Sequence, residues 1–149
     1  MRKLKVARVR KLIAEKPTLV NADESLQELA LAITEDPKTR TLYVVDESKR
    51  LIGLITLMDL IQAVFADLLE IDMLGHRVFR RLSIREASDI MSTVLIYAKD
   101  DDDIETVLKQ MLDNRLAEIP VVDYNMKVIG ELNLLELLTI WVEKAMLEE

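Results

Sequence analysis

Residues 42–46 read Leu-Tyr-Val-Val-Asp, and residues 51–60 read Leu-Ile-Gly-Leu-Ile-Thr-Leu-Met-Asp-Leu. The same pattern returns further along the chain, as Ile-Pro-Val-Val-Asp at 119–123 and Val-Ile-Gly-Glu-Leu-Asn-Leu-Leu-Glu-Leu at 128–137. Matching positions in the two stretches are 77 residues apart. A unit that occurs twice in so short a chain predicts two similar half-domains packed as a pair. Such a pair creates equivalent clefts between its copies, and small ligands bind in clefts.

The composition is that of a globular protein. Of the 149 residues, 50% are hydrophobic and only 4% aromatic, so we expect a core of Leu, Ile, Val and Met. The net charge of −7 disfavours a nucleic-acid partner, because a phosphate backbone is bound by a basic surface. The longest apolar stretch, at 132–142, is too short and too polar to span a bilayer. We therefore expect a cytoplasmic protein without a nucleic-acid or membrane partner, and the absence of cysteine fits a reducing compartment.

Each copy is predicted to contain helix, strand, helix, strand, strand and helix, in that order. Apolar residues three and four positions apart indicate the helices, and short β-rich runs indicate the strands. Ser25, with Glu28 three residues later, has the pattern of a capping box that opens a helix. The elements expected in the first copy span 6–13, 18–20, 26–35, 41–45, 51–55 and 58–69. Those expected in the second span 87–91, 94–98, 104–112, a hairpin around 123–127, and 134–147.

This order of elements, with Val-Val-Asp at the hairpin and Gly-Leu-Ile-Thr-Leu-Met-Asp at the step from strand to helix, resembles the cystathionine β-synthase-type (CBS) domain. Two copies in tandem resemble the pair called a Bateman module. The resemblance implies an α/β (α+β) fold with repeats at 1–69 and 85–149, packed with pseudo-two-fold symmetry and joined by a connector at 70–84. It implies a regulatory protein that binds an adenosine-containing ligand (AMP, ADP, ATP or S-adenosylmethionine) in the cleft between the repeats. It also implies a homodimer that transmits binding to an effector protein.

Gly53, Thr56 and Asp59 lie where the first copy passes from a strand into a helix. Gly53 has no Cβ, so another backbone or a ligand can approach it closely. The Thr56 hydroxyl and the first N–H groups of the helix can hold a phosphate, and the Asp59 carboxylate can accept hydrogen bonds from a ribose. On the residues alone, a helix cap by Thr56, with Asp59 only complementing the helix dipole, explains the pair better. The resemblance, in which the matching Thr and Asp take the phosphate and ribose roles, favours the ligand site.

The resemblance also places adenine against the first strand of a copy and the segment that enters its second strand. The ligand-binding residues of the first copy are then Thr18, Leu19, Val20, Arg40, Thr41 and Leu42, together with Thr56 and Asp59. Backbone groups and apolar side chains would hold the base. Arg40 could pair with a phosphate, but an ordinary exposed arginine explains it equally well.

The second copy departs from this pattern. Its corresponding residues are Ile96, Tyr97, Ala98, Ile119, Pro120, Asn133 and Glu136. Asn133 can still donate to a phosphate, whereas Glu136 is one methylene longer than Asp59, and Glu131 adds negative charge nearby. We expect this second site to be weaker, empty or selective for a less charged ligand.

Two charged clusters each have a plain explanation and a functional one. His76, Arg77, Arg80 and Arg81 could fold over a cleft and neutralise a polyphosphate, but a solvated helix face explains them better. The run at 100–103 is four aspartates, of which Asp103 is the expected N-cap of the next helix. Carboxylates suit Mg²⁺, but the run lacks the spacing of a calcium-binding loop. We therefore expect a solvated cap rather than a metal site.

Three functions follow from these patterns. The first is a sensor of an adenine nucleotide (AMP, ADP or ATP), with or without Mg²⁺, that needs no resident cofactor. The second is a constitutive dimeric interaction module that has lost ligand binding, which the altered second copy favours and the intact Thr56–Asp59 pair opposes. A dimer is predicted because the helices at 57–65 and 134–146 carry more apolar residues than one buried stripe requires; packing against each other within one chain is the alternative. The third is a divalent-cation sensor that uses the acidic run. We expect no catalytic residues, because the chain has no Cys, one His and no Ser–His–acid arrangement.

Overall fold

The chain folds into two compact units, called unit 1 and unit 2 below. The computed structural model describes residues 4–12, 16–36, 39–68 and 84–148, without the side chains of 67–68 and 145–148. Unit 1 consists of residues 1–17 and 96–149, and unit 2 of residues 18–95. The units therefore do not coincide with the two sequence copies, since each unit takes its first helix from the other copy.

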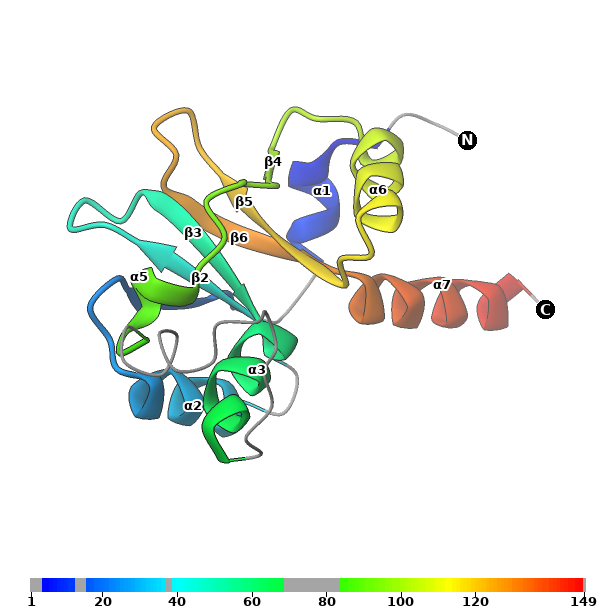
Figure 1. The fold of residues 1–149 in the computed structure, drawn as a ribbon. Coiled ribbons are helices and arrows are strands. Elements are labelled where there is room, and N and C mark those ends of the chain that lie inside the picture. The colour runs from blue at the N-terminus through cyan, green and yellow to red at the C-terminus, as the bar shows by residue number, and fades with distance from the viewer. Residues whose placement is uncertain (1–3, 13–15, 37–38, 69–83, 149) are drawn as a thin grey trace. The chain divides into compact units, whose positions relative to one another are not determined.

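Unit 2 is a three-stranded sheet with helices (Figure 1). Its sheet has the order β1-β2-β3, in which β1 is parallel and β3 antiparallel to β2. The buried core includes Val20, Leu29, Leu42 and Ile55. The elements of unit 2 are β1 (Thr18–Asn21), α2 (Leu26–Glu35), β2 (Thr41–Val45), β3 (Leu51–Thr56), α3 (Leu57–Leu68) and α5 (Ala87–Ile90).

Unit 1 repeats this plan. Its sheet has the order β4-β5-β6, again with one parallel and one antiparallel pair. Val6 and Val9 of its first helix are buried in the same core as Val107 and Ile119. The elements of unit 1 are α1 (Val6–Arg10), β4 (Ala98–Lys99), α6 (Ile104–Asp113), β5 (Glu118–Val122), β6 (Val128–Asn133) and α7 (Leu134–Glu148).

The predicted element order is confirmed, with one strand misplaced. We expected a strand at 94–98, but β4 begins only at Ala98. In unit 2, Leu19 pairs with Tyr43, and by the repeat Tyr97 would pair with Pro120. Pro120 keeps its place opposite Glu131 in β6, so its nitrogen faces β4, where it has no hydrogen to donate. The ladder therefore starts one residue later, at Ala98 and Val121.

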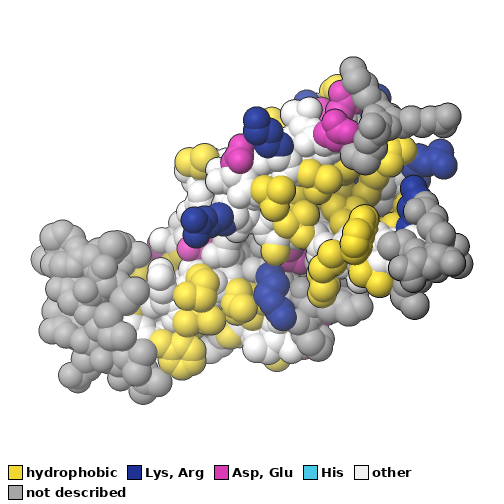
Figure 2. Space-filling view, turned by 90° about the vertical axis from the view of Figure 1, so that its right-hand side faces the viewer, with side chains coloured by type: hydrophobic (Ala, Val, Ile, Leu, Met, Phe, Trp, Pro, Cys, Tyr) yellow, Lys and Arg dark blue, Asp and Glu magenta, His cyan; other side chains and the backbone are white. Residues whose placement is uncertain are grey.

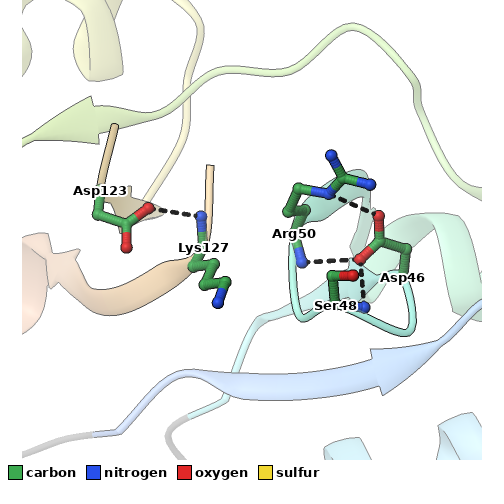
Figure 3. A network of polar contacts seen from close by, with 5 residues as sticks. All are labelled: Asp46, Ser48, Arg50, Asp123 and Lys127. Atoms are coloured by element: carbon green, nitrogen blue, oxygen red, sulfur yellow. Dashed lines mark hydrogen bonds and ion pairs between the residues drawn. The ribbon is translucent and has the colours of Figure 1, made fainter. Parts of the chain in front are cut away.

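In both Val-Val-Asp hairpins the aspartate side chain accepts from the backbone N–H groups two and four residues ahead; Figure 3 draws Asp46 with Ser48 and Arg50, and Asp123 with Lys127. Asp46 Oδ1 accepts from the backbone N–H of Ser48 at 2.8 Å and of Arg50 at 3.0 Å. Asp123 Oδ1 accepts from residues 125 and 127 at the same two distances. An aspartate that bonds the backbone two and four residues ahead closes the turn, which explains why this residue recurs. These bonds also hold the pKa of Asp46 below its ordinary value, chiefly through the Arg50 amide.

Candidate functional site

The three predicted binding segments of the first copy meet at one edge of the unit 2 sheet. In the strand register, Thr18 pairs with Leu42 and Thr41 pairs with Thr56. The starts of β1 and β2 therefore lie beside the end of β3. The backbone N–H of Leu57, the first residue of α3, donates to the carbonyl of Arg40 at 2.9 Å. The chain that enters β2 is thus fastened to the helix that follows β3.

The side chains at this edge divide into a core set and an accessible set. Val20 and Leu42 are 2% and 0% exposed and belong to the core, so they can offer a ligand only backbone groups. Leu19 and Arg40 are exposed, and Thr18 is half-buried. The sequence prediction missed Thr39, which is buried and whose hydroxyl lies 3.2 Å from that of Thr18. Its position just before the β2 segment was the available signal.

Thr56 and Asp59 form a reciprocal cap at the start of α3. The Asp59 N–H donates to Thr56 Oγ1 at 3.1 Å, and the Thr56 N–H donates to Asp59 Oδ2 at 3.0 Å. The predicted cap by Thr56 is therefore confirmed, and Asp59, for which only a dipole role was expected, takes part in the cap as well. It does not exclude ligand binding, because a hydroxyl has one hydrogen to donate and a carboxylate has a second oxygen. The cap instead fixes both side chains, half-buried, in one orientation at the sheet edge.

The equivalent place in unit 1 is built differently. Asn133 Oδ1 accepts from the N–H groups of Leu135 and Glu136 at 2.9 and 3.2 Å. Asn133 Nδ2 donates to Glu118 Oε2 at 3.0 Å, and both side chains are buried. The prediction missed Glu118, although its counterpart in the first copy is Thr41, and this change is visible in the sequence. The other predicted residues are half-buried (Ile96, Tyr97, Glu136) or buried (Ala98, Ile119, Pro120).

Each aspartate of the acidic run contacts a partner within unit 1. Arg10 donates to both oxygens of Asp100, at 2.6 and 2.7 Å, and this guanidinium lowers the pKa of Asp100. Asp101 accepts from the Tyr124 hydroxyl, and Asp102 accepts from the Lys99 N–H at 2.8 Å.

Asp103 occupies the N-cap position of α6, but its side chain makes no capping bond. Its carboxylate instead accepts from Lys5 Nζ at 2.8 Å. Asp103 is therefore the N-cap of α6, as predicted, but without the side-chain capping bond. The run as a whole binds α1 and its own loops.

A pocket at the hairpin end of the unit 1 sheet contains none of the predicted ligand-binding residues. Lys99 Nζ lies 4.9 Å from the centre of the Tyr124 ring there, so a cation of the chain itself already covers this aromatic face. The pocket is lined by Lys99, Asp100, Asp101, Val122, Asp123, Tyr124 and Ile129.

The basic cluster at 76–81 lies outside the described residues. In the part of the chain that the structure describes, no helix is both long and apolar enough to cross a bilayer.

Comparisons with known proteins agree with the two repeats. The family model of the CBS domain matches residues 9–66 and 87–143. A crystal structure of a CBS domain-containing protein from Thermotoga maritima superposes with a TM-score of 0.76 at 36% identity, over 95% of this chain and 96% of the other. The structure of CBSX2 in complex with AMP superposes with a TM-score of 0.70 at 20% identity, over 87% and 90% of the two chains.

The curated relatives are longer proteins. A homoserine O-acetyltransferase from Methanosphaera stadtmanae is 26% identical over 87% of this chain but only 23% of its own length. The chain thus spans about a quarter of the length of the curated relatives that it matches.

Proposed function

This chain belongs to the CBS domain family, and we propose that it is a ligand-sensing regulatory module that binds AMP, ADP or ATP on unit 2 and signals to a partner protein in the cytoplasm. The observation that carries the proposal is the Thr56–Asp59 pair, held in one orientation opposite Thr41 and next to the backbone of Arg40. The similar fold of a CBS protein that contains AMP supports it.

The chemistry of the edge suggests a role for each group. The Thr56 hydroxyl and the N-terminal end of α3 would hold a phosphate, because the helix end carries partial positive charge. The Asp59 carboxylate would accept from the ribose hydroxyls, and Arg40, which directly precedes β2, would bind further phosphates. Adenine would lie against the backbone of Thr18 and Leu19.

Calorimetric titration of the purified chain with AMP, ADP, ATP and S-adenosylmethionine, with and without Mg²⁺, tests the proposal. Replacing both Thr56 and Asp59 by Ala is expected to weaken nucleotide binding at least tenfold, since hydrogen bonds to charged groups contribute about 1.5–3 kcal/mol. The same double replacement also removes a helix cap, so a loss of stability must be separated from a loss of contacts.

The capping box of α2 provides a matched control. Ser25 and Glu28 exchange the same two bonds, at 3.1 and 3.0 Å, within the same unit and away from the proposed site. Replacing both by Ala should lower stability by a similar amount, about 1–2 kcal/mol, and leave nucleotide affinity unchanged. Equal losses of affinity in the two double variants would contradict the assignment of Thr56 and Asp59 to the site.

A dimeric interaction surface is the second candidate function, and it rests on a repeated pattern of exposure. On α3, Met58, Ile61 and Phe65 are 60%, 37% and 42% exposed. On α7 the positions 77 residues later, Leu135, Leu138 and Val142, are 60%, 57% and 42% exposed, and Trp141 beside them is 66% exposed. Figure 2 shows hydrophobic side chains (yellow) on the surface of the face that it draws. Side chains at i, i+3 and i+7 form one stripe on each helix, and such unpartnered stripes fit a homodimer.

Analytical ultracentrifugation tests the dimer. The wild-type chain should sediment as a dimer, and Trp141→Glu should convert it to a monomer. Leu31→Glu is the control, because Leu31 on α2 is 59% exposed but lies outside both stripes. A wild-type monomer at all concentrations would exclude this surface as a self-association site.

A further inference from the structure

The two sequence copies differ in charge at a pair of matched positions on their strands. Thr41 and Thr56 face each other across β2 and β3, and their counterparts Glu118 and Asn133 face each other across β5 and β6. Directly opposed residues lie on the same face of a sheet. Glu118, the counterpart of Thr41, therefore places a carboxylate beside Asn133, the counterpart of Thr56.

The donors that would meet an anion in unit 1 are already used within the protein. Asn133 Oδ1 accepts hydrogen bonds from two amides in the first turn of α7. Among the described residues, Thr56 Oγ1 accepts from one amide of α3. The Asn133 Nδ2 group, which could otherwise donate to a phosphate, donates to Glu118. With Glu118 3% and Asn133 5% exposed, this arrangement is enclosed rather than a surface contact.

Negative charge accumulates around this pair. Glu131 lies two residues before Asn133 on β6, on the same face of the strand, and is 6% exposed. Glu136 follows in the first turn of α7. Unit 2 has Thr41, Leu54 and Asp59 at these three places, and thus one carboxylate instead of three. Each added carboxylate contributes repulsion toward an incoming phosphate, and burial reduces the screening of that contribution by water.

We propose that Glu118 and Asn133 close the unit 1 site to phosphate, so that each chain takes a single adenine nucleotide, on unit 2. The inference rests on the proposed function, in that it concerns the second copy of the same site. It assigns Glu118 as the residue that makes the two copies unequal toward charged ligands.

The test counts ADP molecules bound per chain, by calorimetry and by equilibrium dialysis against labelled ADP. The wild-type chain should bind one ADP, and two equivalent sites would overturn the inference. A variant with Glu118→Thr, Asn133→Thr and Glu136→Asp gives unit 1 the residues of unit 2 at these positions. It should bind a second ADP, and a folded triple variant that still binds one would overturn the inference.

Glu118→Gln covers the case in which the triple variant does not fold. It removes the charge but keeps an oxygen that accepts from Asn133 Nδ2, so the fold should persist. This variant should bind a second ADP where the wild-type chain binds one, and a folded Glu118→Gln variant that still binds one would count against Glu118 as the barrier. The failure of the proposed function looks different, because a folded wild-type chain would then bind no ADP. In that case the triple variant should still bind one ADP, at unit 1, if Glu118 and Asn133 are the barrier. If neither the wild-type chain nor the triple variant bound ADP, both the proposed function and this inference would be overturned.

Discussion

Replacing Gly53 by Ala is expected to destabilise the protein by about 2 kcal/mol, within the ~1–3 kcal/mol typical of an overpacked site. A Cβ on Gly53 would lie 2.4 Å from Sδ, 2.8 Å from Cγ and 2.9 Å from Cβ of Met91. Favourable contacts between carbon atoms begin near ~3.5 Å, so all three atoms would have to move.

Met91 cannot move away freely. The next residue, Ser92, exchanges two backbone hydrogen bonds with Leu54, at 2.8 and 3.0 Å. These bonds fasten the segment to β3 directly beside Gly53, so rotation of the flexible end of Met91 does not relieve the contact with its Cβ. The strain therefore falls on the β3 backbone or on this bridge.

Thermal and urea unfolding measure the effect, which for a chain of this size corresponds to a fall in Tm of about 4–8 °C. Gly130→Ala is the matched control, because its Cβ would lie 3.0 Å from Cδ of Arg10, a flexible side chain that can shift by a few tenths of an ångström. Its cost should be clearly smaller. The double variant Gly53→Ala, Met91→Ala should lose less stability than the sum of the two single variants.

Two results would refute this reasoning. If Gly53→Ala were as stable as the wild-type chain, the close approach of Met91 would not be the reason for a glycine at this position. If the variant kept its stability but lost nucleotide binding, the glycine would be there to admit a ligand, which was the other sequence-based explanation.

Three further predictions follow from the described contacts. Lys49→Gly should stabilise the first hairpin by up to ~1 kcal/mol in urea unfolding, because Lys49 has a φ of 67°, which L-residues adopt at a cost, whereas Ser48→Gly should not stabilise it. The folded-state pKa of Asp100 is depressed by Arg10, so this pair stabilises the protein above the unfolded pKa of about 4 and its contribution is lost as the pH falls below that value; Asp100→Asn should therefore flatten the acid limb of a stability–pH profile, and an unchanged limb would contradict this. Deleting residues 1–17 should expose the amides of β5 and β6 to hydrogen exchange but leave those of β2 and β3 protected, because Val6 and Val9 are buried in unit 1, where each contributes roughly 1.5 kcal/mol or more.

Local signals in the sequence predicted most of the elements. Ser25 and Glu28 form the expected capping box, since both partners lie within one turn and need nothing else. The β-rich runs likewise placed β2 and β3 to within a residue, because these strands are set by their own side chains.

The errors came from partners distant in sequence. Asp103 is the N-cap of α6 as predicted, but its carboxylate binds Lys5, 98 positions away, and makes no capping bond. The strand expected at 94–98 is shortened by Pro120 on the neighbouring strand. In the candidate site, the sequence named Thr56 and Asp59 but missed Glu118, whose significance depends on facing Asn133 across the sheet.

The two repeated glycines each lie against a segment that comes from the other sequence copy. Gly130 lies against Arg10 of α1, a helix from the first sequence copy, and Gly53 lies against Met91, which directly follows α5 of the second copy. In each unit, therefore, the glycine of one copy makes room for a segment supplied by the other. The recurrence of glycine at 53 and 130 is then explained by packing, because each unit contains the first helix of the other copy, and it requires no ligand. Because each core includes residues from the other copy, as Val6 and Val9 in unit 1 and Ala87 in unit 2, the repeat boundaries in the sequence differ from the boundaries of the two compact units.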